Sequence, residues 1–290
     1  MQEDFPIIQI NPTEIFPQFK EIPQPPKTLY IRGSMERVKG TKFLTIVGSR
    51  NNTMYGKNIC KSLIEGLRGY PITIISGLAL GIDSIAHQAA IDAGLPTIAF
   101  PGSGLGWKVL YPAQHRELAK NILTEGGLLI SEYSENTKSA VWTFPRRNRL
   151  EAGISDMTII IEAEEKSGTL ITARLATEYN KTVGSLPGPI NSNSSKGSNW
   201  LLRMGAVPIT SSDDILEELG LKKKMISDVT NHLLLNTEEE KIIEILSEPK
   251  TKEMIISELN LDVASANILF STLEIKGAIK ENFGYIERIV

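Results

Sequence analysis

The sequence contains a single cysteine, Cys60, so no disulfide can form within the chain and a reducing, cytoplasmic setting is expected. It also lacks a long hydrophobic run. The longest mostly apolar stretch, residues 72–82, is interrupted by Ser76 and Gly77 and falls far short of the ~20 residues that a membrane-spanning helix needs. The sequence starts with Met-Gln-Glu-Asp and lacks both the basic start and the following apolar stretch of a secretory signal peptide. We therefore expect no disulfide framework, no membrane span and no signal peptide.

An excess of one charge is also missing from the chain as a whole. Its 31 basic and 34 acidic side chains give a net charge of −3, which argues against a protein that coats polyanions by bulk attraction. The two signs balance at 17 each in residues 41–219, whereas residues 237–290 hold six basic and 11 acidic side chains. Any anion site must therefore be a local cluster in the neutral middle section. A hydrophobic content of 41% excludes a disordered chain.

Proline density and hydrophobic periodicity divide the chain into four segments. Six of the 15 prolines fall in residues 1–40, which predicts an irregular arm that ends in a short edge strand at residues 29–31 and packs on the next domain. Apolar strands and amphipathic helices then alternate through residues 41–219. The periodicity stops at residues 220–236, which we interpret as a linker, and a second unit is expected over residues 237–290.

Residues 41–219 have the pattern of a parallel sheet with helices on both faces. Continuous β-branched runs, such as residues 158–161, are typical of strands that are buried on both sides. The pattern predicts an α/β fold with a Rossmann-like, doubly wound, mainly parallel sheet. The expected strands lie near residues 43–48, 72–76, 97–100, 128–130, 158–162, 183–186 and 207–209. The expected helices lie near residues 55–67, 84–93, 113–122, 170–179, 198–204 and 212–219.

The last unit has the pattern of a small winged-helix domain. Residues 237–240 form a capping box ahead of a first helix, two further helices fit residues 251–258 and 263–276, and a hairpin fits residues 278–289. Such modules often place their third helix in a DNA groove. Here five excess acidic residues would repel phosphates, and the third helix offers only Lys276 as a cation. We therefore expect a protein-contact or regulatory module, and a transcription factor is not favoured.

Small, flexible residues recur where the predicted strands end. Ligands of open parallel sheets bind at this carboxyl edge, and glycine, hydroxyl groups and helix N-termini there favour contact with phosphate. Five such turns on one edge predict an anion site. The turns are Gly48-Ser49-Arg50, Ser76-Gly77, Pro101-Gly102-Ser103-Gly104, Ser167-Gly168-Thr169 and Pro187-Gly188.

The densest candidate site is the run from Trp142 to Arg149, which reads Trp-Thr-Phe-Pro-Arg-Arg-Asn-Arg. Its three arginines, two aromatic rings and amide combine phosphate neutralisation with planar groups on which bases can stack. We interpret the run as an extended loop in which Arg147 and Arg149 share one side. Arg50 and Lys181 are expected on the same edge of the sheet. An ordinary solvated basic loop is the alternative.

Familiar cofactor, metal and catalytic motifs are missing. Residues 101–106 have the wrong spacing for G-x-G-x-x-G, and residues 56–58 do not complete a P-loop. The three histidines and Cys60 lack metal-ligand spacing, and there is no G-x-S-x-G elbow. Asp83 has no acid or base near it in the sequence and is expected to cap a helix. We therefore expect no cofactor, no metal and no catalytic residue.

Short motifs along the chain resemble the DNA-processing protein A family (DprA, also called Smf), in the same order. The resemblance covers residues 22–219, and the tail is similar to that family's winged-helix module. One departure is Glu151, where the family usually has an apolar residue; we expect this glutamate to tune the basic patch. The matching motifs are residues 22–26 and 29–33, Val47 to Arg50, Ser76 to Asp83, Tyr111-Pro112, Phe144 to Arg149, Ser167 to Ala173, Pro187-Gly188 and Gly205-Ala206.

This resemblance implies a single-stranded DNA-binding protein that protects incoming DNA and helps to load a RecA-type recombinase in natural transformation. It further implies a homodimer without an established catalytic centre. A different class, enzymes that cleave nucleoside monophosphates, carries P-G-G-x-G-T-x-x-E, but Thr172 stands where that acid would be. Release of free base from such nucleotides would favour the enzyme. The DNA-binding residues implied by motif are Gly48, Ser49, Arg50, Ser76, Gly77, Phe144, Arg146, Arg147, Asn148, Arg149, Ser167, Gly168, Thr169 and Lys181.

Overall fold

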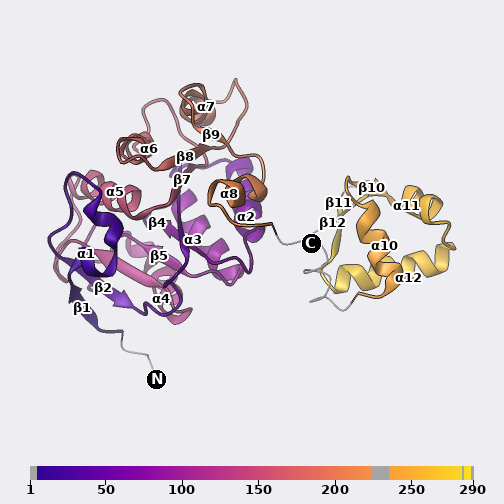
Figure 1. Cartoon of the computed structure of the whole chain (residues 1–290), viewed down its shortest axis with the longest axis horizontal. Coiled ribbons are helices and arrows are strands. Elements are labelled where there is room, and N and C mark those ends of the chain that lie inside the picture. Colours follow the sequence, from indigo (N-terminus) through magenta and orange to yellow (C-terminus); the bar gives the residue numbers. More distant parts are fainter. Residues whose placement is uncertain (1–4, 224–234, 283, 289–290) are drawn as a thin grey trace. The chain divides into compact units, whose positions relative to one another are not determined.

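The structure is a computed structural model that describes residues 5–223, 235–282 and 284–288. The chain divides into two compact units, Met1–Leu221 and Lys222–Val290. Each unit has its own sheet and its own hydrophobic core (Figure 1).

Within the described residues, nine strands of the first unit form one sheet in the order β1-β2-β6-β5-β4-β3-β7-β8-β9. Neighbouring strands from β6 to β9 pair in parallel, while the pairs β1–β2 and β2–β6 are antiparallel. This arrangement confirms the expected α/β, Rossmann-like fold. The strands are β1 (Ile7–Ile10), β2 (Leu29–Gly33), β3 (Lys42–Val47), β4 (Ile72–Ser76), β5 (Thr97–Ala99), β6 (Leu128–Ser131), β7 (Met157–Ile160), β8 (Thr182–Ser185) and β9 (Val207–Pro208).

Helices connect these strands and cover both faces of the sheet. In Figure 1, α2, α3 and α8 lie on one side, whereas α5 and α6 lie on the other. The helices are α1 (Pro12–Ile15), α2 (Met54–Glu65), α3 (Ile82–Asp92), α4 (Arg116–Thr124), α5 (Thr143–Ile154), α6 (Thr169–Glu178), α7 (Lys196–Arg203) and α8 (Ser212–Glu218), with short 3₁₀ helices η1 (Pro17–Lys20), η2 (Ala113–His115) and η3 (Asn193–Ser195).

Successive apolar residues of the central strands form the core on both faces, because neighbouring side chains of a strand point in opposite directions. Leu44 and Ile46 of β3 pack with α2, α3 and α8, while Phe43 packs with α5 and the N-terminal arm. Cys60 of α2 is fully buried in the first of these clusters. Burial raises the pKa of its thiol to about 12, so the thiolate is suppressed at neutral pH.

The N-terminal arm differs from expectation. Residues 29–31 were predicted as an edge strand, and this prediction is wrong because β2 lies between β1 and β6. The sequence analysis missed β1, because this four-residue strand lies between Pro6 and Pro12 in a segment that was interpreted as irregular. Phe16 and Phe19 are buried in the same cluster as Leu150 of α5, which ties the arm to the sheet. The expected strands and helices of residues 41–219 lie within about two residues of the observed ones, with two exceptions. The helix expected at residues 113–122 is divided into η2 and α4, and α5 was not expected.

The second unit contains α10 (Thr237–Ile245), β10 (Lys250–Thr251), α11 (Lys252–Leu259), α12 (Val263–Ile275), β11 (Ile279–Asn282) and β12 (Tyr285–Arg288). Its three strands form an antiparallel sheet in the order β10-β12-β11. The capping box was placed one residue too late, because Asn236 caps α10 and pairs with Glu239. Three helices and a closing hairpin follow the expected order, and the winged-helix classification stays a prediction.

No helix in the described parts of the chain has the length and apolar character that crossing a bilayer would require.

Candidate nucleic-acid interface

An exposed arginine and two aromatic rings meet at the carboxyl edge of the sheet. Arg50 follows β3, and its guanidinium lies 5.6 Å from the ring centroid of Phe144, in the first turn of α5. The ring of Tyr111 lies beside Phe144, with centroids 5.6 Å apart. We call Arg50, Tyr111 and Phe144 the aromatic platform. A cation beside stacked ring surfaces suits a nucleotide, since phosphate pairs with the cation and a base with a ring.

Gly102 sets the position of the Phe144 ring. A Cβ atom at Gly102 would lie 2.5 Å from Cε1 of Phe144, closer than any side chain tolerates. The glycine turn after β5 therefore supplies the surface on which the ring rests. Here the close approach of two groups, and not an unusual backbone angle, requires glycine.

The loops after β3, β4 and β7 are bonded to one another. The Ile82 N–H donates to the Ser49 carbonyl oxygen at 3.2 Å, and the Thr169 hydroxyl donates to the Gly48 carbonyl oxygen at 3.1 Å. Gly81 has φ +81°, and a Cβ there would lie 2.3 Å from the Ser49 carbonyl oxygen. The structure thus brings residues Gly48 to Arg50 and Ser167 to Thr169 together at the carboxyl edge of the sheet, as the sequence predicted. We call the loops after β3, β4 and β7 the rim.

Ser76, Gly77 and Asp83 organise the loop after β4 from inside. The Ser76 hydroxyl donates to the Ile46 carbonyl oxygen at 2.6 Å, so it points into the sheet. The Gly77 and Ala79 N–H groups donate to the buried Asp83 carboxyl, each at 3.2 Å. Burial raises the pKa of Asp83, and the positive charge of Arg147 partly opposes that rise. Asp83 therefore holds the loop ahead of α3. The expectation that it caps the helix is wrong, because Gly81 is the N-cap residue and Asp83 lies in the first turn, where it accepts from loop N–H groups.

The run of residues 142–149 is helical, so the prediction of an extended loop is wrong. Pro145 concealed the helix in the sequence, yet a proline in the first turn removes only an N–H that has no partner within the helix. Residues two apart on a helix point roughly 200° apart. Arg147 and Arg149 consequently do not share one side, and each contacts different groups.

Arg147 is an interior residue with 7% of its side chain exposed. Its Nη1 donates to the Gly77 carbonyl oxygen at 2.6 Å and to the Phe100 carbonyl oxygen, which joins the ends of β4 and β5. The same nitrogen lies 3.3 Å from Oε1 of Glu151, one helical turn further along α5. Arg147 therefore supports the rim from below.

Glu151 is almost completely buried, with 1% of its side chain exposed. Burial raises the pKa of this carboxyl to about 8, although the Arg147 charge acts in the opposite direction. At neutral pH this carboxyl is therefore largely protonated, so it lies beside Arg147 without cancelling the arginine charge. Glu151 contacts the interior arginine and not the exposed Arg146, and the expectation that it tunes the basic patch stays a prediction.

The other residues of the run divide between interior and surface. Arg149 donates to the Gln24 carbonyl oxygen at 2.8 Å and to Glu132 at 2.5 Å, so it ties the arm to the end of β6. The Asn148 side-chain oxygen accepts a bond from Arg147 Nε at 3.2 Å. Arg146 is 58% exposed, and its Nε lies 3.9 Å from Glu132 Oε2. Of the three arginines in this run, Arg146 is the one directed to the surface.

Lys181 does not lie on the predicted edge. It precedes β8, at the amino end of the parallel strands, and pairs with Glu21 at 2.9 Å. The expectation that Lys181 extends the patch around Arg50 is therefore wrong, because the two residues occupy opposite ends of their strands. The sequence could have shown this, because Lys181 lies just before the expected strand at residues 183–186 and does not follow it.

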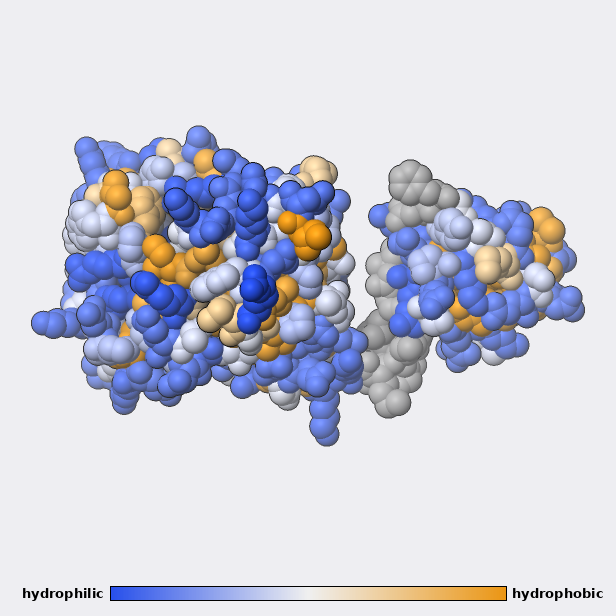
Figure 2. All heavy atoms as spheres, turned by 90° about the horizontal axis from the view of Figure 1, so that it is seen from above, coloured by the Kyte–Doolittle hydropathy of each residue, from blue (hydrophilic) through white to orange (hydrophobic). Residues whose placement is uncertain are grey.

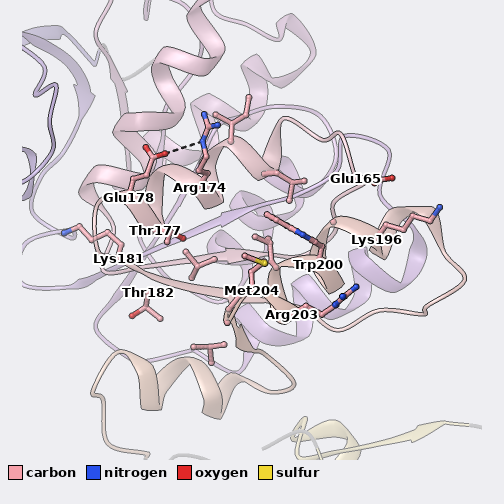
Figure 3. Close-up of a pocket in the computed structure, with 18 of the residues that line it drawn as sticks. Glu165, Arg174, Thr177, Glu178, Lys181, Thr182, Lys196, Trp200, Arg203 and Met204 are labelled. Carbon is pink, nitrogen blue, oxygen red and sulfur yellow. Dashed lines mark ion pairs between the residues drawn. The ribbon is translucent and has the colours of Figure 1, made fainter.

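Lys181 instead lines a groove of about 1220 Å³ beside α6, α7 and β9. Figure 3 shows charged side chains around it, including Arg174, which pairs with Glu178 at 3.5 Å. Figure 2 shows one face of the molecule, on which small hydrophobic patches lie among hydrophilic residues. The groove mixes both signs of charge with apolar groups such as Trp200 and Met204 and was not anticipated from the sequence.

The structure also identifies candidate residues that the sequence analysis left out. Tyr111 was noted only as part of a motif, because a lone tyrosine in a glycine-rich stretch gives no signal of its own. Trp142 and Tyr133 form a second ring pair, with centroids 5.7 Å apart and planes at 83°. Trp142 was part of the run described above, but nothing in the sequence linked it to a residue of the loop after β6.

Comparison with known proteins gives consistent matches. The sequence model of the DNA recombination-mediator protein A family matches residues 7–220. The chain is 34% identical to protein Smf of Escherichia coli over 226 residues, 78% of this chain and 60% of that protein. It is 37% identical to the DNA processing protein DprA of Bacillus subtilis over 200 residues, 69% of this chain and 66% of that protein. The chain thus spans less than two thirds of the length of either relative.

Two solved structures resemble this chain over about three quarters of its length. The X-ray structure of DNA processing protein A from Streptococcus pneumoniae aligns with a TM-score of 0.68 at 34% identity, covering 77% of this chain and 76% of that one. DNA processing protein A from Helicobacter pylori, whose structure concerns its single-stranded DNA binding mode, aligns with a TM-score of 0.67 at 32% identity, covering 76% of this chain and 98% of that one.

Proposed function

Because the chain belongs to the DNA recombination-mediator protein A family, we propose that it binds single-stranded DNA at the carboxyl edge of its large sheet. The observation that carries this proposal is the aromatic platform, in which the exposed Arg50 lies 5.6 Å from the ring centroid of Phe144. Single strands are bound where cations track phosphates and rings stack bases, largely without regard to sequence. The acidic overall charge makes such a local site necessary.

Within this proposal the residues implied by motif take different roles. Gly48, Ser49, Arg50 and Phe144 lie at the rim, and Arg146 extends it at the surface. Ser167, Gly168 and Thr169 contribute hydroxyl and backbone groups from the loop after β7. Arg147 and Arg149 act from below by holding backbone carbonyl oxygens, so their effect on DNA is indirect.

We propose binding without turnover. Thr172, buried in α6, occupies the position where the nucleotide-cleaving class carries its acid. A hydroxyl group cannot supply the negative charge that glycosidic cleavage needs at that position. Incubation with nucleoside monophosphates should therefore release no free base above the background of buffer alone.

The proposed partners follow from the family. We propose that the protein acts in the cytoplasm, protects incoming single strands and helps to load a RecA-type recombinase on them, as a homodimer. Light scattering on the purified chain tests the dimer, and recombinase filament assembly on coated single strands tests the loading.

The direct test compares labelled single-stranded and double-stranded oligonucleotides over a salt series. We expect tighter single-strand binding that weakens as salt rises, because phosphate contacts release counterions. Arg50→Ala should lower affinity about 10- to 100-fold and reduce the magnitude of the salt slope by about 0.7, the value of one single-strand phosphate contact. Arg203→Ala, an exposed arginine of α7 at the distant groove, is the matched control. Equal affinities for the Arg50 and Arg203 variants would remove the platform from the site.

A further inference from the structure

Trp142 is the most exposed tryptophan of the chain, with 56% of its surface open to solvent. A large ring left in water is costly, and exposed aromatic groups often mark contact surfaces. Trp142 lies at the start of α5, but its position there does not account for the exposure, since a ring that only packed the helix end would be covered. This exposure indicates that the Trp142 ring is part of a contact surface.

The indole is held in place by Tyr133. The rings make an edge-to-face contact with centroids 5.7 Å apart, a geometry that fixes orientation while leaving ring surface open. Tyr133 is itself anchored, because its N–H donates to the Ser131 hydroxyl at 3.0 Å at the end of β6. The indole thus has a defined position before any ligand arrives.

Positive charge accompanies the pair. Arg146 is 58% exposed and only distantly paired with Glu132, at 3.9 Å, so its guanidinium can still donate to a phosphate. Its charge also acts on Tyr133, where it opposes the rise in the hydroxyl pKa that burial causes. Lys138 lies exposed in the same loop. The two rings match those of the aromatic platform, and two cations accompany them where the platform has the one cation of Arg50.

The pair continues the platform along the same edge. Arg50 follows β3 and Tyr133 follows β6, which are three positions apart in the sheet order β6-β5-β4-β3. At ~4.8 Å between neighbouring strands, these positions are separated by about 14 Å. Trp142 directly precedes α5 and Phe144 lies in its first turn. The two rings contact different partners, Phe144 towards Gly102 and Trp142 towards Tyr133. One strand of nucleic acid could therefore meet both.

We propose that Trp142, held by Tyr133 and flanked by Arg146, is a second base-stacking position for single-stranded DNA, on the β6 side of the aromatic platform. This inference rests on the proposed function and adds to it the direction of the strand along the sheet edge. Stacking on an indole is open to every base, so the position extends the binding site without adding sequence preference.

The test measures affinity for labelled oligothymidylates of increasing length. Trp142→Leu keeps an apolar side chain but removes the ring face, and Trp142→Phe keeps a smaller ring. We expect Trp142→Leu to lose about 5- to 100-fold on oligonucleotides long enough to reach both positions, and little on the shortest that bind. Trp142→Phe should recover most of the loss. Phe144→Leu should weaken binding at every length.

Trp200→Leu is the matched control, because Trp200 is a tryptophan of similar exposure, 50%, on α7. It should bind like the parent chain. Equal affinity of parent and Trp142→Leu at all lengths, with Phe144→Leu still impaired, would overturn the inference and leave the proposed function intact. Equal loss at every length would also overturn it, since it would indicate damage to the first position. Failure of the parent chain to bind single strands would instead refute the proposed function.

Discussion

Neighbouring arginines of α5 should respond in opposite ways to removal. Arg147→Ala should destabilise the first unit, whereas Arg146→Ala should mainly weaken binding to single-stranded DNA. The reason is their environment: Arg147 is 7% exposed and joins the carbonyl oxygens of Gly77 and Phe100, while Arg146 is 58% exposed. Substitution of two adjacent residues of one type separates the supporting role from the contact role.

The size of the effect follows from the groups that Arg147 leaves behind. Breaking a buried ion pair by removing one partner costs about 3–5 kcal/mol. The low end of that range applies here, because burial raises the pKa of Glu151 to about 8 and the carboxyl is already largely protonated at neutral pH. The remaining cost comes from the Gly77 and Phe100 carbonyl oxygens, which lose their buried hydrogen-bond donor. We therefore expect a loss of about 3 kcal/mol for Arg147→Ala and less than about 0.5 kcal/mol for Arg146→Ala.

Urea unfolding followed by tryptophan fluorescence measures this difference. All three tryptophans, Trp107, Trp142 and Trp200, belong to the first unit, so the signal reports that unit alone. With a slope of about 2–3 kcal/mol per molar urea, Arg147→Ala should lower the midpoint by about 1 M or more. Arg147→Lys should recover only part of the loss, because one ammonium group cannot match the planar fork of the guanidinium.

Binding measurements on the same variants complete the test. Arg146→Ala should reduce the salt dependence of binding by about one phosphate contact, ~0.7 in slope. The reasoning would be refuted by an Arg147→Ala protein with the parent's urea midpoint, or by one that is fully folded yet loses as much salt dependence as Arg146→Ala. Either result would place the Arg147 guanidinium at the DNA and not beneath the rim.

Three further outcomes are expected. The pKa of Glu151 is raised from its ordinary 4.5 to about 8, so its contribution to stability is complete below about pH 4.5 and is lost as the pH rises through 8; Glu151→Gln should flatten the fall in urea midpoint measured between pH 6 and 9. Gly102→Ala should displace the Phe144 ring, since the added Cβ would lie 2.5 Å from it, and should weaken single-strand binding in fluorescence anisotropy, whereas Gly168→Ala, where a Cβ meets open space, should not impose such a displacement. A chain ending at Leu221 should keep most single-strand affinity, while the isolated second unit should bind neither form of DNA; salt-sensitive binding by that unit would contradict the expectation from its acidic charge.

The sheet could be predicted because its strands carry a simple signal. Runs such as Ile72 to Ser76 are apolar without interruption and end in glycine turns, which identifies both the strand and the edge at which ligands bind. The helix α5 could not be predicted in the same way. Its buried face includes Arg147 and Glu151, so charged residues occupy positions where an apolar period would have revealed a helix. β1 was missed for another reason, since it is only four residues long and lies between Pro6 and Pro12, in a segment whose proline density indicated irregular structure.

The candidate site was predicted in composition but not in geometry. Arg50 and Phe144 are far apart in the sequence, and the sheet order brings them together. The three arginines of α5 have different roles because they point in different directions around the helix. The sequence analysis assigned them to an extended loop, which wrongly placed Arg147 and Arg149 on one side. Lys181 shows the same limit, because its residue type suggested a phosphate contact while its place before β8 puts it at the other edge.

The burial of Cys60 has a practical consequence for anyone who labels this protein. Its thiol lies fully inside the core under α2 with a pKa raised to about 12, and the thiolate is the reactive form. Alkylating reagents should therefore react very slowly with Cys60 while the first unit is folded. A cysteine introduced at an exposed position could carry a dye without removal of the native thiol. The rate at which Cys60 is modified would report how often the first unit opens in the absence of denaturant.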